Sequence, residues 1–157
     1  MCLVGVRSTS PDAGLVAILV ERGGPGMLAV PVGVREGLSL AAGEVGPATS
    51  WTGLMGRCAE AAEARLSHVR LDVDDDARLV ARLVVEVPAC ADKVMAVPCT
   101  PGEGLLLSGY HRFPVHASSS LTRLRAVDLS DDYGAEQFEQ WRRMLLRTND
   151  LADDTRD

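Results

Sequence analysis

Hydrophobic and polar residues alternate along several segments of the chain, and a period of two is typical of strands. These segments are rich in valine and fall at residues 2–8, 14–21, 27–32, 69–74, 81–87 and 93–99. Sequences that favour turns, such as SPDAG, ERGGPG and DVDDDA, separate them. The third and the sixth segments each run into a sequence that suits a helix. The pattern therefore predicts two groups of three strands, each followed by a helix.

The two helix-forming stretches share one sequence pattern. AVPVGVREGLSL begins at Ala29 and AVPCTPGEGLLL begins at Ala96, an offset of 67 (96 − 29) without a gap. Glu36 and Glu103 are among the matched positions. Because each stretch closes a group of three strands, we expect two β-β-β-α units related by a pseudo-twofold axis. The predicted fold class is α+β, with a mixed or antiparallel sheet, helices packed on it and a C-terminal helix.

The predicted organisation is one main domain and a C-terminal extension. In chain order, the parts are a domain over residues 1–120, with repeat halves at about 1–50 and 68–117 and a linking helix at 51–66, and then an extension over 121–157 with a helix at about 135–147. In that last helix Phe138, Trp141 and Leu145 lie at helical spacing. Its narrow apolar face suits docking on the domain or on a second subunit.

The linking segment carries an apolar stripe at helical spacing. The members of this stripe are Trp51, Leu54, Met55, Cys58, Ala61, Ala62 and Leu66. Thr49 or Ser50 can accept a hydrogen bond from an amide group of the first turn and so cap the helix. We therefore expect the stripe to pack against the core.

The second copy of the repeat places a capping motif at its helix start. Thr100 falls at the N-cap, Pro101 at the first helical position and Glu103 at the third, which is the spacing of a capping box. The Glu103 carboxylate can then accept from the Thr100 amide and oppose the helix dipole. The first copy has Gly33 and Glu36 at the corresponding positions. Both glutamates are therefore expected to stabilise helix starts, and catalysis is the alternative role.

A glycine directly follows each of these glutamates, Gly37 in the first copy and Gly104 in the second. Inside a helix a glycine costs about 0.5–1 kcal/mol relative to alanine. Such a residue is tolerated where another backbone or side chain must come close, so we expect close packing at both positions.

The hairpin that follows the linking helix has one apolar face and one charged face. A fold at residues 74–76 would place Arg78 near Asp72 and Arg82 near His68. The charged face has two interpretations. Its side chains form cross-strand charge pairs in solvent, or its arginine and histidine side chains bind an anionic ligand.

Charge and composition narrow the choice of partners. The net charge is −6, which disfavours nucleic acid as a partner unless arginine is concentrated on one face. The opening residues do not resemble a signal peptide, and no apolar run is long enough to span a membrane. None of the four cysteines forms a C-x-x-C pair, so we expect buried, reduced thiols. We expect a cytoplasmic homo-oligomer with no membrane partner.

The order of these elements and motifs resembles the bifunctional nuclease (BFN) domain family, over about residues 1–120. VPVGVREGLSLAAGEVGPATSWTGLMGRCAEAAEARLSHVRL is similar to that family's first two motifs. Pro31 and Glu36 match the first motif, and Pro47, Thr49 and Leu54 match parts of the second. The resemblance implies a duplicated β-β-β-α fold that self-associates, and a nuclease activity.

The third motif of that family is represented by CTPGEGLLLSGYHRFPVHAS. Pro101 occupies its proline position, Glu103 replaces the family's aspartate, and FPV stands for its closing strand. The family's Arg-Pro-Ser-Asp thus reads Thr-Pro-Gly-Glu here, and its Thr-His-Asp reads Thr-Ser-Trp from Thr49. The chain therefore resembles a divergent member that has lost several polar residues of the family's motifs.

A nuclease is the first functional hypothesis, because metal-assisted hydrolysis of a phosphodiester needs acidic or histidine ligands beside the scissile phosphate. Glu36 and Glu103 would bind Mg²⁺ or Mn²⁺ and form the catalytic centre. His68 or His111 would transfer protons, and Arg82 or Arg112 would bind phosphate.

Two further hypotheses use the same fold. In the second, the chain is a non-catalytic regulatory or binding module that keeps the fold for assembly. In the third, it is an enzyme for a small molecule, with a pocket near the pseudo-twofold axis. Glu36, Glu103 and the GYHRF sequence, which begins with Gly109 and Tyr110, would line that pocket.

Overall fold

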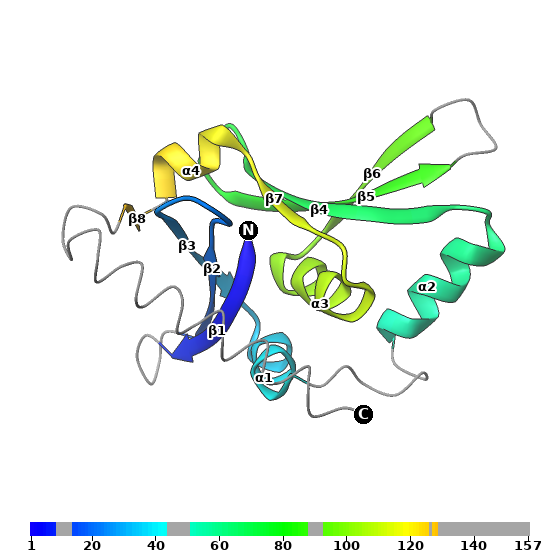
Figure 1. The fold of residues 1–157 in the computed structure, drawn as a ribbon, viewed down its shortest axis with the longest axis horizontal. Helices are drawn as coiled ribbons and strands as arrows, with labels where there is room; N and C mark the ends of the chain where they lie inside the picture. Colours follow the sequence, from blue (N-terminus) through cyan, green and yellow to red (C-terminus); the bar gives the residue numbers. More distant parts are fainter. Residues whose placement is uncertain (9–13, 44–50, 88–92, 126, 129–157) are drawn as a thin grey trace.

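The computed structural model describes residues 1–8, 14–43, 51–87, 93–125 and 127–128, and within them the chain is an α+β protein. Two four-stranded sheets and four helices make up this part of the chain (Figure 1). The predicted fold class is confirmed at this level, with one antiparallel and one mixed sheet. The helix expected at about 135–147 lies outside the described residues. Within them, no helix combines the length and the apolar character that crossing a membrane requires.

The first sheet has the strand order β1-β2-β3-β8, and all neighbouring strands are antiparallel. Its strands are β1 (Cys2–Ser8), β2 (Leu15–Val20), β3 (Gly26–Val32) and β8 (Val127–Asp128). Alternate residues of β2 and β3 point into the core, so that Leu19, Leu28 and Val30 are fully buried. Helix α1 (Val34–Ala42) follows β3 after Gly33.

The second sheet has the order β6-β5-β4-β7. Its strands are β4 (Arg65–Val73), β5 (Leu79–Val87), β6 (Lys93–Cys99) and β7 (Val115–Ala117). The first three form an antiparallel meander, and β7 runs parallel to β4. Val69, Leu71 and Leu83 point into the core. Helix α3 (Pro101–His111) follows β6 after Thr100.

Helix α3 contacts strands of both sheets, and α1 and α2 (Trp51–Ala61) lie on either side of it (Figure 1). Leu105 and Leu107 of α3 are buried in the same core as the inward residues of β2, β3, β4 and β5. The short helix α4 (Ser119–Arg125) contacts β3 and β4 and adds Leu121 to this core. One core therefore joins the two sheets, with α3 at its centre.

The linking helix differs from its prediction in both length and packing. Helix α2 ends at Ala61, because β4 already begins at Arg65. Trp51, Leu54 and Met55 are 43%, 52% and 37% exposed, so the prediction that the apolar stripe packs against the core is wrong.

Small residues of α2 face the domain in place of that stripe. Thr52 and Gly53 are the buried residues of the helix, and a Cβ atom at Gly56 would overlap the His111 ring of α3. Glycine lets two helices approach closely, so the face of α2 with small residues packs against α3. The large side chains of α2 therefore lie on the opposite, outward face. Cys58 is exposed with them, which contradicts the expectation of a buried thiol.

The β4–β5 hairpin has a different register from the predicted one. Arg82 lies opposite Arg70, and Arg78 lies in the turn before β5. The predicted register is therefore wrong: Arg82 is a diagonal neighbour of His68 and not its direct partner, and Asp72 pairs with Val80 instead of Arg78.

The reason is a longer turn than the three aspartates suggest. The Asp74 amide donates to the Arg78 carbonyl at 3.0 Å, and the Asp74 carboxylate accepts from the amides of Asp76 and Arg78 at 3.1 and 2.8 Å. Ala77 completes the turn in the left-handed region, with φ of 58°. The turn thus includes Ala77 and Arg78, which shifts the second strand relative to the first.

Candidate functional site

The two repeated glutamates lie at neighbouring helix starts, since α1 and α3 contact each other. At the start of α3 the Thr100 hydroxyl accepts from the Glu103 amide at 3.2 Å, and the Glu103 carboxylate accepts from the Thr100 amide at 2.7 Å. The predicted capping box, with Pro101 in the first turn, is confirmed. These reciprocal bonds satisfy amide groups that a helix start otherwise leaves without an intrahelical acceptor.

Glu36 occupies the same position in α1 but has different surroundings. The N-cap residue Gly33 supplies no side-chain hydrogen bond. Glu36 lies against the start of α3, where the Thr100 hydroxyl is 3.5 Å from its Oε1, at the long limit for a hydrogen bond. A Cβ atom at Gly102 would lie 2.9 Å from both the Cβ and the Cδ of Glu36. Gly102 therefore leaves the space that the Glu36 side chain fills.

The glycines that follow the glutamates pack closely, as predicted. A Cβ atom at Gly37 would lie 2.9 Å from Leu15 Cβ and 3.1 Å from Val32 Cγ2. At Gly104 the corresponding atom would lie 3.0 Å from a Val69 methyl group and 3.5 Å from the sulfur of Cys99. Each helix thus rests on its sheet at its glycine.

Two carboxylates therefore meet across one threonine, and their capacity to bind a cation depends on further ligands. One oxygen of Glu103 already accepts the Thr100 amide. A Mg²⁺ ion takes six ligands and is often held by one or two carboxylates together with water or substrate oxygens. Within the described parts of the chain, no three histidine, cysteine or acidic side chains form a group suited to a metal ion. The glutamate pair therefore has no third acidic, histidine or cysteine ligand there.

His111 and Tyr110 lie at the opposite end of α3, beside α2. His111 Nε2 lies 2.9 Å from the Thr52 carbonyl oxygen, to which it can donate. The His111 ring meets Tyr110 edge-on at 4.8 Å and is nearly parallel to Phe113 at 6.2 Å between centroids. Arg112 ends the helix in the left-handed region. His111 thus joins α2 to α3.

His68 and Arg82 lie on the face of the second sheet that points away from α3. Val69, which follows His68, packs against α3, and Arg82 lies between the buried residues Ala81 and Leu83; adjacent residues of a strand point to opposite faces. Arg82 lies opposite Arg70 on β4, and Arg70 lies opposite His116 on β7, which places these three side chains in one row. The His68 ring stacks on the His116 ring with 4.6 Å between centroids. We call the four residues Arg70, Arg82, His68 and His116 the outer basic row.

The predicted site residues therefore occupy three separate places. Glu36 and Glu103 meet at the helix starts, whereas His111 lies eight residues after Glu103 (111 − 103), or about 12 Å along the helix axis. His68 and Arg82 are on the other side of the second sheet. The structure brings together the two glutamates, and it brings His68 and Arg82 to one face, but it does not join these groups.

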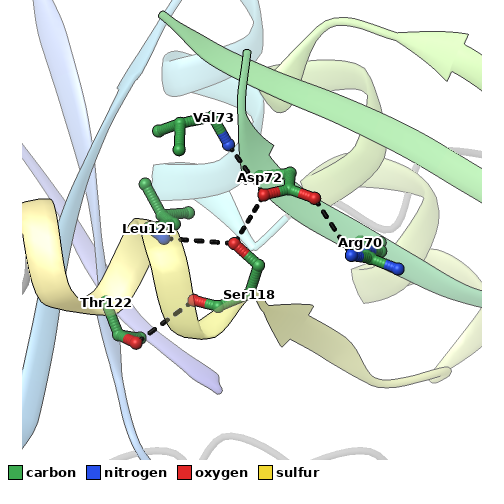
Figure 2. A network of polar contacts seen from close by, with 6 residues as sticks. All are labelled: Arg70, Asp72, Val73, Ser118, Leu121 and Thr122. Carbon is green, nitrogen blue, oxygen red and sulfur yellow. Dashed lines mark hydrogen bonds and ion pairs between the residues drawn. The ribbon is translucent and has the colours of Figure 1, made fainter. Parts of the chain in front are cut away.

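A network of hydrogen bonds holds Arg70 within the outer basic row (Figure 2). Its Nη2 donates to Asp72 Oδ2 at 3.1 Å, and Asp72 Oδ1 accepts from the Ser118 hydroxyl at 2.6 Å and from the Val73 amide at 2.9 Å. The Ser118 oxygen also accepts from the Leu121 amide at 3.1 Å, which caps α4. Arg70 is thereby connected to the start of α4 through Asp72 and Ser118.

The surroundings of this face change the pKa values of two carboxylates and one histidine. The Ser118 hydroxyl, the Val73 amide and Arg70 hold the pKa of Asp72 below its ordinary value. Hydrogen bonds from Ser67 and Arg65 lower the pKa of Glu86 in the same way.

Burial, reinforced by His116 and Arg70, lowers the pKa of His68, although Glu86 opposes this shift. The two carboxylates are thus ionised and engaged by neighbours, while His68 is biased towards its neutral form.

Arg70 and His116 were not among the candidate residues that the sequence indicated. Arg70 became relevant because the hairpin register places it opposite Arg82, and His116 because β7 pairs with β4. The signal in the sequence was the alternation in HVRLDVD, which puts His68 and Arg70 on the polar face. The pairing of β7 with β4 depends on contacts between distant segments and has no comparable local signal.

No family model matches the chain, and a search of curated proteins found no match.

Proposed function

We propose that the chain is a non-catalytic binding module on an α+β scaffold. One observation carries this proposal: the groups that a nuclease would use lie in three separate places, and of the two glutamates Glu103 caps α3 while Glu36 packs against the start of that helix. Hydrolysis of a phosphodiester needs metal ligands, a proton-transfer group and a phosphate-binding group around one scissile bond. In this chain the length of α3 separates the glutamates from His111, and the second sheet separates both from His68 and Arg82.

The small-molecule enzyme of the third hypothesis has less support. It requires open space beside the GYHRF sequence, yet His111 contacts Thr52, Gly56 and Phe113 there. The Ser108 hydroxyl also donates to the Phe113 carbonyl at 2.6 Å. Protein groups therefore occupy the surroundings of His111.

The proposal includes a duplicated origin for the two halves, with a pseudo-twofold relation between them. Each half consists of a three-stranded antiparallel meander followed by a helix. Gly37 packs on Val32 and Gly104 packs on Cys99, and both pairs differ by the same offset of 67 (104 − 37 and 99 − 32). The same features support descent from the BFN domain family, with the fold retained and its polar motifs changed.

A cleavage assay tests the non-catalytic function. The protein is incubated with labelled single- and double-stranded DNA and RNA, with and without Mg²⁺ or Mn²⁺, beside a mock purification. We expect no cleavage above the mock level. The proposal is overturned by cleavage that is lost in the double variant Glu36→Gln plus Glu103→Gln and kept in Asp75→Asn plus Asp76→Asn. Glutamine still accepts the capping hydrogen bond, and the second variant makes the same charge change in the hairpin turn.

Self-association is also part of the proposed function. Val94, Met95 and Val97 are 61%, 45% and 40% exposed on β6, which is an edge strand of the second sheet. Exposed apolar edges and surfaces favour contact with another chain. Light scattering should show a stable oligomer, and deletion of residues 135–157 should weaken it. A protein that is monomeric both with and without these residues contradicts this part of the proposal.

A further inference from the structure

We infer that the outer basic row binds a small anion that carries phosphate groups. This inference rests on the proposed function and names the class of ligand that the binding module takes. Arg70 and Arg82 would bind the phosphate oxygens, and His116 with His68 would border the site.

The arrangement of the two arginines carries the inference. Arg70 and Arg82 lie directly opposite each other on β4 and β5, which corresponds to about 4.5–5.5 Å between their Cβ atoms. Like charges at this distance on a sheet destabilise it. The Arg82 side chain forms no ion pair or hydrogen bond with any other residue that the structure describes. A bound anion would supply the counter-charge that this position lacks.

Of the two carboxylates nearest to the row, Glu86 is bonded to groups outside it, and Asp72 pairs with Arg70 but not with Arg82. Glu86 accepts from Arg65 at 2.6 Å and from the Ser67 hydroxyl at 2.7 Å. Asp72 bonds Ser118 and takes a single nitrogen of Arg70. A guanidinium group has five N–H donors, so Arg70 keeps donors for a ligand, and its side chain is 56% exposed. Positive charge therefore remains available on this face.

Phosphate fits the row better than a monovalent anion does. Two guanidinium groups can each donate two parallel hydrogen bonds to one phosphate, which offers several oxygens and up to two negative charges. The ring N–H groups of His116 and His68 can donate hydrogen bonds beside it. Because the chain carries a net charge of −6, we favour a small phosphorylated molecule over nucleic acid.

The row is also held in place before any ligand binds. Asp72 fixes Arg70 and is itself fixed by Ser118 and the Val73 amide, so Arg70 is connected to the start of α4 (Figure 2). A donor that is already positioned loses less conformational freedom on binding. Asp72 and Ser118 are therefore positioning residues for Arg70.

Titration calorimetry with inorganic tripolyphosphate tests the inference. The unmodified protein should bind it with saturation, and Arg82→Gln should raise the Kd about tenfold or more, as expected for a lost charge-assisted bond. Arg78→Gln is the matched control, because Arg78 is 78% exposed in the turn of the same hairpin, outside the row. Its Kd should stay within a factor of two of that of the unmodified protein, while Arg70→Gln plus Arg82→Gln should abolish binding.

Three results would overturn the inference. They are absence of saturable binding at millimolar tripolyphosphate, an equal loss of affinity in Arg82→Gln and Arg78→Gln, and tighter binding of single-stranded oligonucleotides that grows with their length. The last result would assign the row to nucleic acid instead. These readouts are separate from cleavage, so failure of the anion site and failure of the non-catalytic function can be told apart.

Discussion

The starts of α1 and α3 have the same sequence pattern but differ in how they are stabilised. Helix α3 begins with a capping box and lies at the centre of the core. Helix α1 begins at a glycine without a side-chain cap, and its Val34 and Leu38 are 62% and 61% exposed. The matched glutamates therefore do different things: Glu103 caps its own helix, and Glu36 lies against the neighbouring one.

This difference shows that a repeated residue does not carry a repeated role. The N-cap residue decides which bonds the glutamate can make, because threonine offers a hydroxyl and glycine does not. The residue at the second helical position decides how close the neighbouring helix comes. Gly102 leaves room there for Glu36.

The largest expected effect comes from filling the space at the two inner glycines. Gly37→Ala should lower the free energy of unfolding by about 1–2 kcal/mol, because overpacking against Leu15 and Val32 exceeds the gain in helix propensity. Gly104→Ala should cost less than half as much, since its nearest neighbour, a Val69 methyl group, would be 3.0 Å away, whereas Leu15 Cδ1 would be 2.6 Å from a Cβ atom at Gly37. Urea unfolding measures both. A larger loss for Gly104→Ala would reverse the comparison.

Removal of the cap should have the next largest effect. Thr100→Ala should lower the free energy of unfolding by about 1 kcal/mol, because the Glu103 amide loses its acceptor. Thr100→Ser keeps the hydroxyl and is the control. Gly33→Ser offers a hydroxyl cap to α1, but its Cβ requires the Glu36 carboxylate to move, so its net effect should stay within a few tenths of a kcal/mol. If Thr100→Ala is as stable as Thr100→Ser, the capping box does not distinguish the helices.

Truncation of the two glutamates should separate their roles more finely. Glu103→Ala should cost about 0.5–1 kcal/mol, from the loss of the bond to the Thr100 amide and of a negative charge near the helix dipole. Glu36→Ala should cost less than half of this, since its contact with Thr100 is long. Thermal unfolding of both variants provides the comparison. Equal costs would show that Glu36 also caps its helix.

The smallest expected effect is the pH dependence of stability, which should arise from His68 in the outer basic row and not from the helix starts. The pKa of His68 is lower in the folded protein than its unfolded value of about 6.5. The unfolded chain therefore binds more protons just below pH 6.5, so stability should fall as the pH decreases through that window and be constant above it. His68→Gln should reduce this slope and Thr100→Ala should keep it, as urea unfolding between pH 5.5 and 7.5 would show. A slope unchanged by His68→Gln contradicts the assignment.

Local features of the sequence predicted the local structure well, whereas contacts between distant segments could not be predicted from the sequence. The capping box involves residues three apart, so its spacing alone identified Thr100 and Glu103. Strand alternation likewise located the strands of both meanders. The contact between Glu36 and Gly102 depends on how α1 and α3 pack, which no local pattern encodes.

The outward face of α2 and the row of Arg70 and Arg82 were missed for the same reason. The apolar stripe predicts that α2 is a helix with one apolar face. The small residues on the opposite face, however, decided which face packs against α3. In the hairpin, the inclusion of Ala77 in the turn shifted the register and brought the two arginines together. Both outcomes depend on details that hydrophobic periodicity does not contain.

In this interpretation Glu103 caps α3, Glu36 packs against the start of the same helix, and neither carboxylate holds a metal ion. Its most direct test is a titration with Mn²⁺, a paramagnetic ion, followed by the amide signals of residues 33–37, 100 and 102–104 in nuclear magnetic resonance spectra. We expect no line broadening confined to the amide signals of these residues up to millimolar Mn²⁺. Selective broadening at micromolar Mn²⁺ that is lost in Glu36→Gln plus Glu103→Gln would contradict it.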